Sequence, residues 1–517
     1  MANKSVFASL KGRLLPKADA RNAEGAPAYA YGAQHKLAQL AVTGTFGQTF
    51  YQDAQAELET AVELAETVDA HFLAQTAVYA RETGYMKDMP AVLLAVLARR
   101  DPVLFRQVFN RVVTHGKMLR TFVQVMRSGQ TGRKSLGTAP KAMVQTWLNS
   151  ASDRALLHTN VGRDPSLADV LKMVHPKPRD KTREALFAWV LGKPADLTAL
   201  PREVQDWMAF KETGEGPLPQ VPFQMLTQLP LTTEHWAQLA RNGSWQMVRQ
   251  SLNTFLRHGV FDDPAMVALV AEKLRDPEAV TKARAFPYQL MVAALNVGDE
   301  MPVEVREALH DAMELAVRNV PKVVGEVVVG PDVSGSMMSS VSGYRRGATS
   351  RVRHVDVAAL VAAAFLRVNR RATVLPFHET VVKTRLDARD TVLTNAEKLT
   401  QLGWGGTNVS APLKWLNDRD RAPDLVVFVS DNQSWADTRP GRGTAMMREW
   451  EMLKTANPRA KMVCVDIAPY GTTQALERDD VMNVGGFSDA VFDQIAAFAS
   501  GRSGPNHWVG EIEKVEV

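Results

Sequence analysis

The sequence lacks the features of secreted and membrane proteins. Its 517 residues include a single cysteine, Cys464, so the chain cannot form an internal disulfide. Apolar runs such as Ala91 to Leu97 are too short to span a bilayer. The first residues also lack the apolar core of a secretory signal peptide. We therefore expect a cytoplasmic protein with no membrane partner.

Extremes of composition are absent as well. Hydrophobic residues make up 45% of the chain and charged residues 23%, which is ordinary for a globular protein. A length of 517 residues implies more than one domain. The net charge of +5 and the pI near 9.1 permit nucleic-acid binding without establishing it. Cys464 lies in the strand-like residues 461–466, so we expect a buried and unreactive thiol.

The first two thirds of the chain predict a basic arm followed by a helical domain. Residues 1–30 carry basic side chains among Gly, Ala and Pro, which indicates an arm that is ordered in part at most. In residues 31–321 apolar side chains recur about every 3.6 residues, and short Gly, Pro or Asp breaks separate the segments. No fixed-period motif is evident, so we expect diverged repeats of the HEAT type. Expected helices include residues 54–70, 74–83, 90–99 and 102–115.

The pattern changes after residue 321, and residues 322–517 predict an α/β domain. Apolar, β-branched runs now alternate with helix-like segments, which indicates a doubly wound parallel sheet. The expected strands are residues 323–329, 372–377, 425–430, 461–467 and, more weakly, 481–485. The expected helices are residues 355–369, 409–417, 444–456 and 488–500.

Oxygen-bearing side chains gather where these strands end. Asp332, Ser334 and Ser336 follow the first strand on a loop, and Asp431 ends the third strand. Thr407 lies on a glycine-containing loop between them. Ligands bind at the carboxyl ends of strands in such sheets. Carboxylate and hydroxyl oxygens suit Mg²⁺, whereas zinc prefers His and Cys.

The order of these residues resembles the metal-ion-dependent adhesion site of von Willebrand A domains. The resemblance rests on Asp332-Val333-Ser334-Gly335-Ser336, then Thr407, then Asp431. It implies that Mg²⁺, or another divalent cation, binds to Asp332, Ser334, Ser336, Thr407 and Asp431. Asp431 either contacts the metal, directly or through water, or holds a serine hydroxyl in place. The alternative is an ordinary turn capped by serine, with Thr407 and Asp431 unrelated to it.

A basic band in the helical region is the second candidate site. Lys and Arg clearly outnumber Asp and Glu between residues 99 and 184, and they are interleaved with Gly, His and hydroxyl residues. Such a surface can bind phosphates, although a solvated helix face has the same composition. The predicted phosphate contacts are Arg133, Lys134, Lys141, Arg163, Lys172, His175, Lys177 and Arg179.

The helical region resembles the TROVE module of Ro autoantigen proteins, and the A domain that follows completes the resemblance over nearly the whole chain. The residues that carry it are Gly44 to Tyr51, Gly132-Arg133-Lys134 leading to Trp147, Asp169 to Lys172 with His175 to Pro178, Leu239 to Gly243, Phe286 to Leu290 with Ala293, and Gly485-Gly486-Phe487.

The resemblance implies a ring of helical repeats closed by the A domain. Proteins of this family bind small noncoding Y RNAs on a basic outer surface. They bind single-stranded ends of misfolded or structured RNAs through the central hole. Bacterial relatives connect RNA to an exoribonuclease or to RNA-repair enzymes. His175 matches the RNA-contacting histidine of the family, and Arg163 matches a nearby basic contact.

A noncatalytic RNA-binding protein that acts in RNA quality control or processing is therefore the preferred hypothesis. A metal-dependent adaptor for protein partners is the first alternative. An Mg²⁺-dependent ribonuclease that uses Asp332 and Asp431 is the second, although phosphoryl-transfer sites usually combine two metals with several carboxylates. The basic segment 342–354 either adds an RNA or protein contact or is an exposed insertion.

Overall fold

The computed structural model describes residues 15–45, 53–283, 287–317, 320–341, 352–435, 443–486, 488–503 and 506–517. The chain forms two compact units. The helical unit contains residues 61–279, 297–308 and 515–517, and the A unit contains residues 1–60, 280–296 and 309–514. Packing thus groups the segments 280–296 and 309–321 with the C-terminal part of the chain, although their helical pattern belongs to the region before residue 321.

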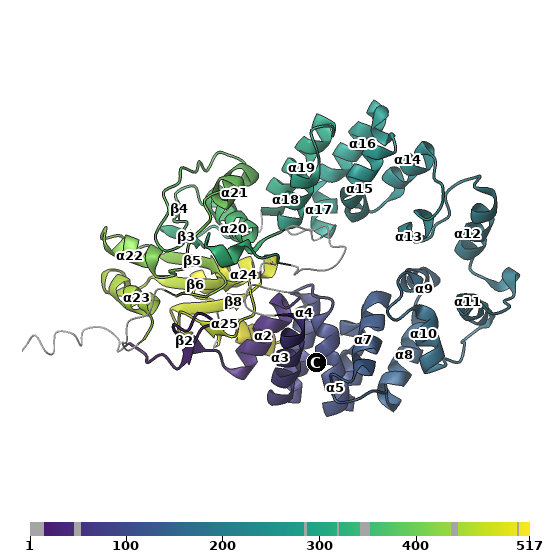
Figure 1. Ribbon diagram of the computed structural model, residues 1–517, viewed down its shortest axis with the longest axis horizontal. Helices are drawn as coiled ribbons and strands as arrows, with labels where there is room; N and C mark the ends of the chain where they lie inside the picture. Colours follow the sequence, from purple (N-terminus) through teal and green to yellow (C-terminus); the bar gives the residue numbers. More distant parts are fainter. Residues whose placement is uncertain are drawn as a thin grey trace, which may run out of the picture. The chain divides into compact units, whose positions relative to one another are not determined.

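The helical unit is a succession of short helices in which each contacts the next one or two along the chain (Figure 1). This arrangement is that of a helical-repeat domain and confirms the predicted class. Its helices are α4 (Ala70–Glu82), α5 (Met89–Arg100), α6 (Pro102–Val112), α7 (Gly116–Ser128), α8 (Thr138–Ser150), α9 (Asp153–Asn160), α10 (Leu167–Val174), α11 (Lys181–Val190), α12 (Arg202–Thr213), α13 (Phe223–Leu226), α14 (Thr233–Asn242), α15 (Trp245–Arg257) and α16 (Pro264–Arg275).

Local sequence explains where these helices begin and how they pack. Asp101 caps the start of α6 by accepting hydrogen bonds from the backbone N–H groups of Val103 and Leu104, and proline fills the first helical position. The buried rings of Phe105, Phe109 and Phe122 meet at centroid distances of 5.5 to 5.7 Å and join α6 to α7. Three helices, α3 (Ala54–Thr67), α17 (Pro277–Ala283) and α19 (Val303–Ala316), have residues in both units.

The A unit is built on a parallel five-stranded sheet in the order β4-β3-β5-β6-β8. The strands are β3 (Val327–Pro331), β4 (Thr373–Val374), β5 (Leu425–Ser430), β6 (Lys461–Asp466) and β8 (Val481–Gly485). The predicted strands 425–430 and 481–485 are confirmed. The predicted strand 323–329 begins four residues too early and ends two residues too early, because Val324 is 98% exposed and Gly325 takes a φ of +109°. The predicted strand 372–377 is reduced to two residues.

Helices cover both faces of this sheet, as expected for a doubly wound domain (Figure 1). On one face α20 (His354–Val368) packs on β3 and β5, and α24 (Asp489–Ala499) packs on β6 and β8. On the other face α22 (Ala411–Asn417) and α23 (Ala445–Ala456) share a hydrophobic core with the sheet. The remaining helices of the unit are α2 (Ala33–Thr43), α18 (Pro287–Asn296), α21 (Val392–Thr400) and α25 (His507–Glu513). The sequence pattern did not predict α21.

The N-terminal segment forms a second, small sheet with the A unit. Strand β1 (Ala20–Arg21) pairs with β2 (Pro27–Ala30), and β2 pairs with β7 (Thr472–Thr473), both antiparallel. Tyr29 of β2 is buried in the core beside α23. The described part of the predicted basic arm is therefore ordered, which the sequence pattern did not reveal.

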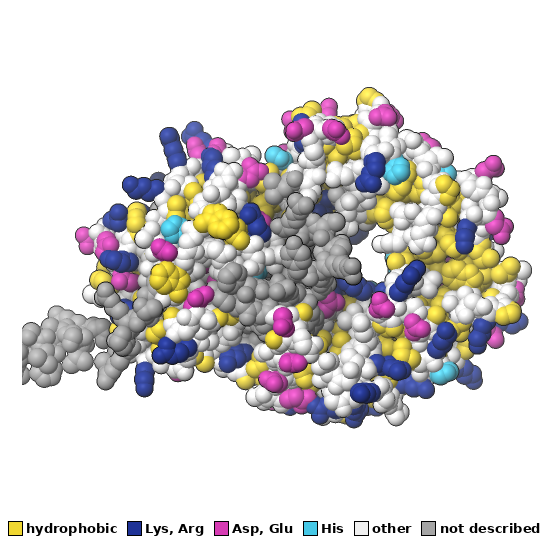
Figure 2. Space-filling view, in the orientation of Figure 1, with side chains coloured by type: hydrophobic (Ala, Val, Ile, Leu, Met, Phe, Trp, Pro, Cys, Tyr) yellow, Lys and Arg dark blue, Asp and Glu magenta, His cyan; other side chains and the backbone are white. Residues whose placement is uncertain are grey.

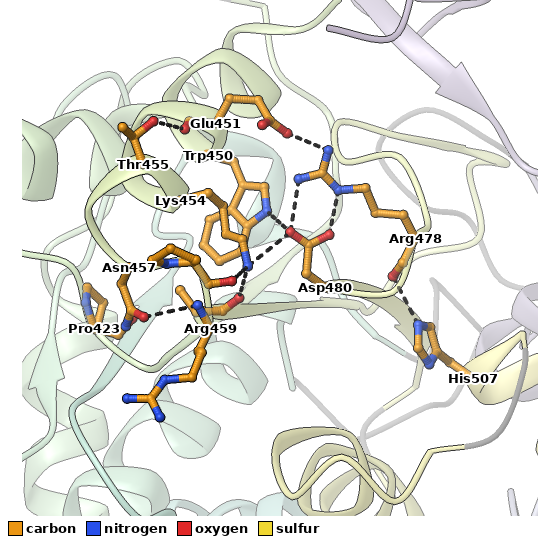
Figure 3. Close-up of polar contacts among 12 residues, drawn as sticks. Pro423, Trp450, Glu451, Lys454, Thr455, Asn457, Arg459, Arg478, Asp480 and His507 are labelled. Carbon is orange, nitrogen blue, oxygen red and sulfur yellow. Dashed lines mark hydrogen bonds and ion pairs between the residues drawn. The ribbon is translucent and has the colours of Figure 1, made fainter. Parts of the chain in front are cut away.

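A polar network closes the end of the sheet where β6 and β8 begin (Figure 3). Asp480 accepts hydrogen bonds from Trp450 Nε1 at 3.2 Å and from Arg478, and it pairs with Lys454 at 3.4 Å. Arg478 also pairs with Glu451. The network ties α23 to the start of β8, at the opposite end of the strands from the candidate metal residues.

Some predictions fall on residues that the structure does not describe. These are residues 46–51, 286 and 487 of the family resemblance and residues 342–351 of the basic segment. Among the described residues, every helix is too short or too polar to pass through a bilayer. Cys464 is buried, as predicted, and burial raises the pKa of its thiol.

Candidate metal and nucleic-acid sites

The Asp332 loop is held at the carboxyl end of β3 by its neighbours on both sides. Its backbone N–H donates to Val429 of β5 at 3.0 Å, and the next N–H, of Val333, donates to Phe377 at 2.9 Å. Oδ1 of Asp332 accepts the N–H of Ser334 at 2.8 Å. The hydroxyls of Ser334 and Ser336 lie 3.4 Å apart. The first three predicted ligands therefore share one buried loop.

A second loop brings Thr407 to the same end of the sheet. The carbonyl of Gly405 accepts the N–H of Gly335 at 3.1 Å, so the Thr407 loop lies directly on the Asp332 loop. A Cβ at Gly406 would lie 1.8 Å from Nε1 of Trp435, so a larger residue there would displace the indole ring. Thr407 itself is 4% exposed. Two tryptophans flank this buried residue at the surface, since Trp404 is 78% and Trp435 40% exposed.

Asp431 completes the set at the end of β5. Its side chain is buried, and Oδ1 accepts the N–H of Gln433 at 3.2 Å. Oδ2 has no hydrogen-bond partner in the described part of the chain. Burial, together with the nearby carboxylate of Asp332, raises the pKa of Asp431 to about 7, and the Ser336 hydroxyl offsets part of that shift. Two carboxyl groups thus share a dry site at close range.

Two residues that sequence reasoning missed complete this polar end of the sheet. Ser430 donates its hydroxyl hydrogen to Oδ2 of Asp332 at 2.7 Å. Asp466, which ends β6 beside Ser430, is a further buried carboxyl, and burial raises its pKa well above the ordinary value. Neither residue belongs to a short motif. The position of each at a strand end was the only available signal.

The donor set fits a hard divalent cation. The loops bring together two carboxylates and three hydroxyl residues, and no His or Cys belongs to the set. Oδ2 of Asp431 is a buried carboxylate oxygen without a hydrogen-bond partner among the described residues, so a bound cation would stabilise this carboxylate. Within the described residues no group of three or more His, Cys, Asp or Glu side chains is placed to hold a metal ion.

In the helical unit an open cavity of about 670 Å³ gathers part of the predicted basic band. Arg163 lines it from the loop after α9, and Lys172 from α10. Arg127 of α7, which was not among the predicted contacts, lines it as well. The carboxylate of Asp169 also borders the cavity, but it accepts the N–H and the hydroxyl of Ser166 at 3.0 and 2.6 Å.

A second group of predicted contacts follows α10. His175 ends this helix with a φ of +49°, and Pro176 prevents its continuation. Two side chains of α8 then hold the extended segment. Gln145 donates to the carbonyl of Val174 at 2.6 Å, and Asn149 donates to that of Lys177 at 2.9 Å. The side chains of His175, Lys177 and Arg179 are all exposed.

Most of the predicted contacts have no hydrogen-bond or ion-pair partner among the residues that the structure describes. Arg179 forms an ion pair with Asp180 at 3.0 Å. The other side chains form neither a hydrogen bond nor an ion pair with any described residue: Arg133, Lys134, Lys141, Arg163, Lys172, His175 and Lys177. Figure 2 shows Lys and Arg side chains, with some Asp and Glu, over the region of α8, α10 and α11 in this view.

The fold and the two sites define a protein that joins a helical-repeat unit to a von Willebrand A-type domain. Residues 326–499 match the family model described as the Ro60 vWA domain. The chain is 26% identical to the RNA-binding protein RO60 of Deinococcus radiodurans over 94% of its own length and 96% of that protein. It is 24% identical to the RNA-binding protein RO60 of Caenorhabditis elegans over 46% of this chain and 38% of that one.

The fold has a solved counterpart. The crystal structure of the Ro (RSR) protein of Deinococcus radiodurans superposes with a TM-score of 0.64 at 23% identity, covering 91% of this chain and all of that one. These comparisons confirm the resemblance to the Ro family and the predicted fold class. They leave the individual metal and RNA contacts as predictions.

Proposed function

We propose that this chain is a noncatalytic RNA-binding protein. The observation that carries the proposal is the cavity at which Arg127, Arg163 and Lys172 converge. Residues 175–179, which carry further exposed basic side chains, follow directly after α10, the helix of Lys172. Cations without protein partners are suited to phosphate oxygens, and such contacts give affinity with little dependence on sequence. The curated relatives are named as RNA-binding proteins, which supports the same conclusion.

The proposed ligands are a small noncoding RNA of the Y type and the single-stranded ends of structured or misfolded RNAs. A flexible end can adapt to a curved basic surface, whereas a closed duplex presents fixed phosphate positions. A role in RNA quality control or processing follows if such ends are passed to an exoribonuclease or an RNA-repair enzyme. A ring of helical repeats that admits only single strands is part of the same proposal.

The RNA proposal is tested by filter binding with three ligands: a structured RNA with a frayed end, the same RNA with a closed blunt end, and a single strand. We expect the frayed RNA to bind most tightly and the affinity to fall steeply with salt. The variant Arg127→Ala should weaken this binding, because it removes one of the three cations of the cavity. Equal affinity for all three ligands, or no effect of Arg127→Ala, would contradict the proposal.

We further propose that the A domain binds Mg²⁺ or another divalent cation. Asp332, Ser334, Ser336, Thr407 and Asp431 would hold it, and the cation would neutralise two carboxylates that burial otherwise destabilises. Isothermal calorimetry with MgCl₂ on the full chain is the direct test. An undetectable heat of binding, together with an unchanged melting temperature, would contradict it.

A metal-dependent adaptor remains the second candidate function. The specific observation in its favour is the pair of exposed tryptophans, Trp404 and Trp435, beside the candidate ligand Thr407. Exposed aromatic residues next to a bound cation suit a protein partner that supplies a carboxylate. A nuclease reaction is less well supported, since two-metal nuclease sites use several carboxylates as ligands and no group of three or more His, Cys, Asp or Glu among the described residues is placed to hold a metal ion. Incubation of labelled RNA with the protein and Mg²⁺ tests the nuclease directly.

A further inference from the structure

A turn of the N-terminal segment docks against the residues that follow Asp431. The side-chain amide of Asn22 donates to the carbonyl of Ser434 at 2.5 Å. The next backbone N–H, of Ala23, donates to Oε1 of Gln433 at 2.9 Å. More than 400 positions separate the partners in sequence, so the contact is a product of the tertiary fold.

Hydrogen bonds within the turn define its conformation. Oδ1 of Asn22 accepts the N–H groups of Glu24 at 3.1 Å and Ala26 at 2.9 Å, and Gly25 takes the positive φ of +75° that the turn requires. Asn22 is 7% exposed and Gln433 is fully buried. The bond from Asn22 to Ser434 is buried and the bond from Ala23 to Gln433 is partly buried, so loss of either partner should be costly.

The residues that receive this turn also hold two of the candidate metal ligands. Gln433 donates its backbone N–H to Oδ1 of Asp431 at 3.2 Å. Ser434 donates its hydroxyl hydrogen to the carbonyl of Thr407 at 3.3 Å. Residues 433–434 thus link the turn to the Asp431 carboxylate and to the Thr407 loop.

The rest of the N-terminal segment fixes the turn from the other side. The phenol oxygen of Tyr29 accepts the N–H of Thr444 at 3.4 Å, and the phenol donates to the carbonyl of Pro16 at 3.0 Å. Tyr29 and Ala30 also pair with β7. The segment is anchored by its strand, so the turn can hold residues 433–434 in one position.

We propose that the turn Asn22–Ala26 is a positioning element for the metal site, with Asn22 and Gln433 as its positioning residues. The inference rests on the proposed binding of a divalent cation. Groups that hydrogen-bond to metal-ligating residues typically change metal affinity by about 10- to 100-fold when they are altered. Coupling is reciprocal, so metal binding should in turn strengthen the docking of the N-terminal segment.

The test uses the full chain and two variants that break the contact from opposite sides. Asn22→Asp keeps the Oδ1 acceptor of the turn but loses the donor to Ser434 and sets a carboxylate against that carbonyl. Gln433→Met keeps the side-chain volume and the backbone N–H to Asp431. It loses the acceptor for Ala23 and also the Nε2 donor to the backbone carbonyl of Asp431 at 3.4 Å. The matched control is Asp19→Ala, which removes a hydrogen bond from the same segment, to Ala30 at 2.8 Å, without touching residues 433–434.

Calorimetric titration with MgCl₂ should show about tenfold weaker binding for Asn22→Asp and for Gln433→Met. The double variant should bind about as weakly as the weaker single variant, because each substitution releases the same docked turn although they remove different hydrogen bonds. The control should bind within about twofold of the wild type. Hydrogen exchange of the amides in residues 22–26 should slow when Mg²⁺ is added to the wild type, and this effect should be lost in both variants.

The outcomes distinguish failure of the positioning role of the turn from failure of the proposed Mg²⁺ binding. If the wild type binds no Mg²⁺, the metal proposal fails and this inference falls with it. Suppose instead that the wild type binds Mg²⁺. The inference alone is then overturned if the folded variants bind Mg²⁺ as tightly as the wild type and if Mg²⁺ does not slow hydrogen exchange of residues 22–26 in the wild type. If Asn22→Asp does not fold, Gln433→Met decides in the same way.

Discussion

Ser430 and Asp332 are joined by a hydrogen bond of 2.7 Å between the ends of β5 and β3. This bond takes one oxygen of the Asp332 carboxylate, and the N–H of Ser334 takes the other. The carboxylate is therefore oriented from both its own loop and the neighbouring strand. A site whose first side chain is fixed in this way is preorganised, so a cation can bind without first ordering that residue.

Removal of two candidate ligands should abolish the response to metal. We expect Asp332→Ala combined with Thr407→Ala to lose the rise in melting temperature that MgCl₂ gives the wild type, because ligand-dependent stabilisation requires binding to the folded state. Differential scanning fluorimetry with and without 5 mM EDTA measures this. RNA affinity should change little, since the proposed RNA contacts lie in the helical unit. Loss of RNA binding by a folded double variant would show that the two roles are not separate.

A single substitution at Asp431 should separate its two possible roles. Asp431→Asn removes a charge at nearly constant shape, and its amide oxygen can still accept the N–H of Gln433. We expect the fold to be retained and Mg²⁺ to bind more weakly, because one of two buried negative charges is lost. Calorimetry at pH 8, where the carboxyl is ionised, gives the comparison. An unchanged affinity would assign Asp431 a purely structural part.

Glu477 should make the stability of the protein depend on pH. Burial raises the pKa of this carboxyl from 4.5 to about 7. Above pH 4.5 unfolded chains release its proton, whereas folded chains keep it until about pH 7. The free energy of unfolding therefore falls as the pH rises through this window.

We expect Glu477→Gln, which cannot ionise, to remove that fall. At pH 8 the variant should be more stable than the wild type by on the order of 3 kcal/mol, and at pH 5 the two should be nearly equal. The glutamine oxygen can still accept the two hydrogen bonds from Asn483. Urea denaturation followed by tryptophan fluorescence at both pH values is the measurement, and a difference independent of pH would refute this account.

The parts of the fold that the sequence predicted are those with strong local patterns. Strand β5 is a run of apolar, mostly β-branched residues ending in serine, and its bounds were predicted without error. Helix α10 likewise has local limits, because Ser166 caps its start and Pro176 follows its end. The N-terminal sheet was missed, because the four residues of β2 become a strand only by pairing with β7, far along the chain.

In the candidate sites, too, the residues that were predicted are those marked by local sequence patterns. The five candidate metal residues were found because each stands at a strand end or in a loop with a recognisable order. Ser430 and Gln433 were not found, because their roles depend on Asp332 and Asn22, which lie about 100 and 400 residues away. Arg127 was left out of the predicted contacts for the same reason, since only the packing of α7 against α10 brings it to the cavity with Lys172.

Reversal of one charge beside α10 should weaken RNA binding more than removal of a contact does. Lys177 is exposed, and its backbone carbonyl accepts a hydrogen bond from Asn149, which a side-chain substitution leaves in place. We expect Arg163→Ala and His175→Ala to weaken binding of a structured RNA, and Lys177→Glu to weaken it further by repelling phosphate. Loss of one phosphate contact should reduce the slope of log K against log salt by about one.

The matched control for that charge reversal is Glu63→Lys on the acidic helix α3, where Glu63 is also exposed. Added positive charge at this position should cause no loss of RNA affinity, so a loss specific to Lys177→Glu reports on the surface and not on the overall charge of the chain. Filter binding between 50 and 300 mM salt measures both variants, with circular dichroism as the check on folding. If folded Lys177→Glu binds with wild-type affinity and slope, RNA does not contact the segment that follows α10, because a reversed charge within a Debye length of a bound phosphate cannot be neutral.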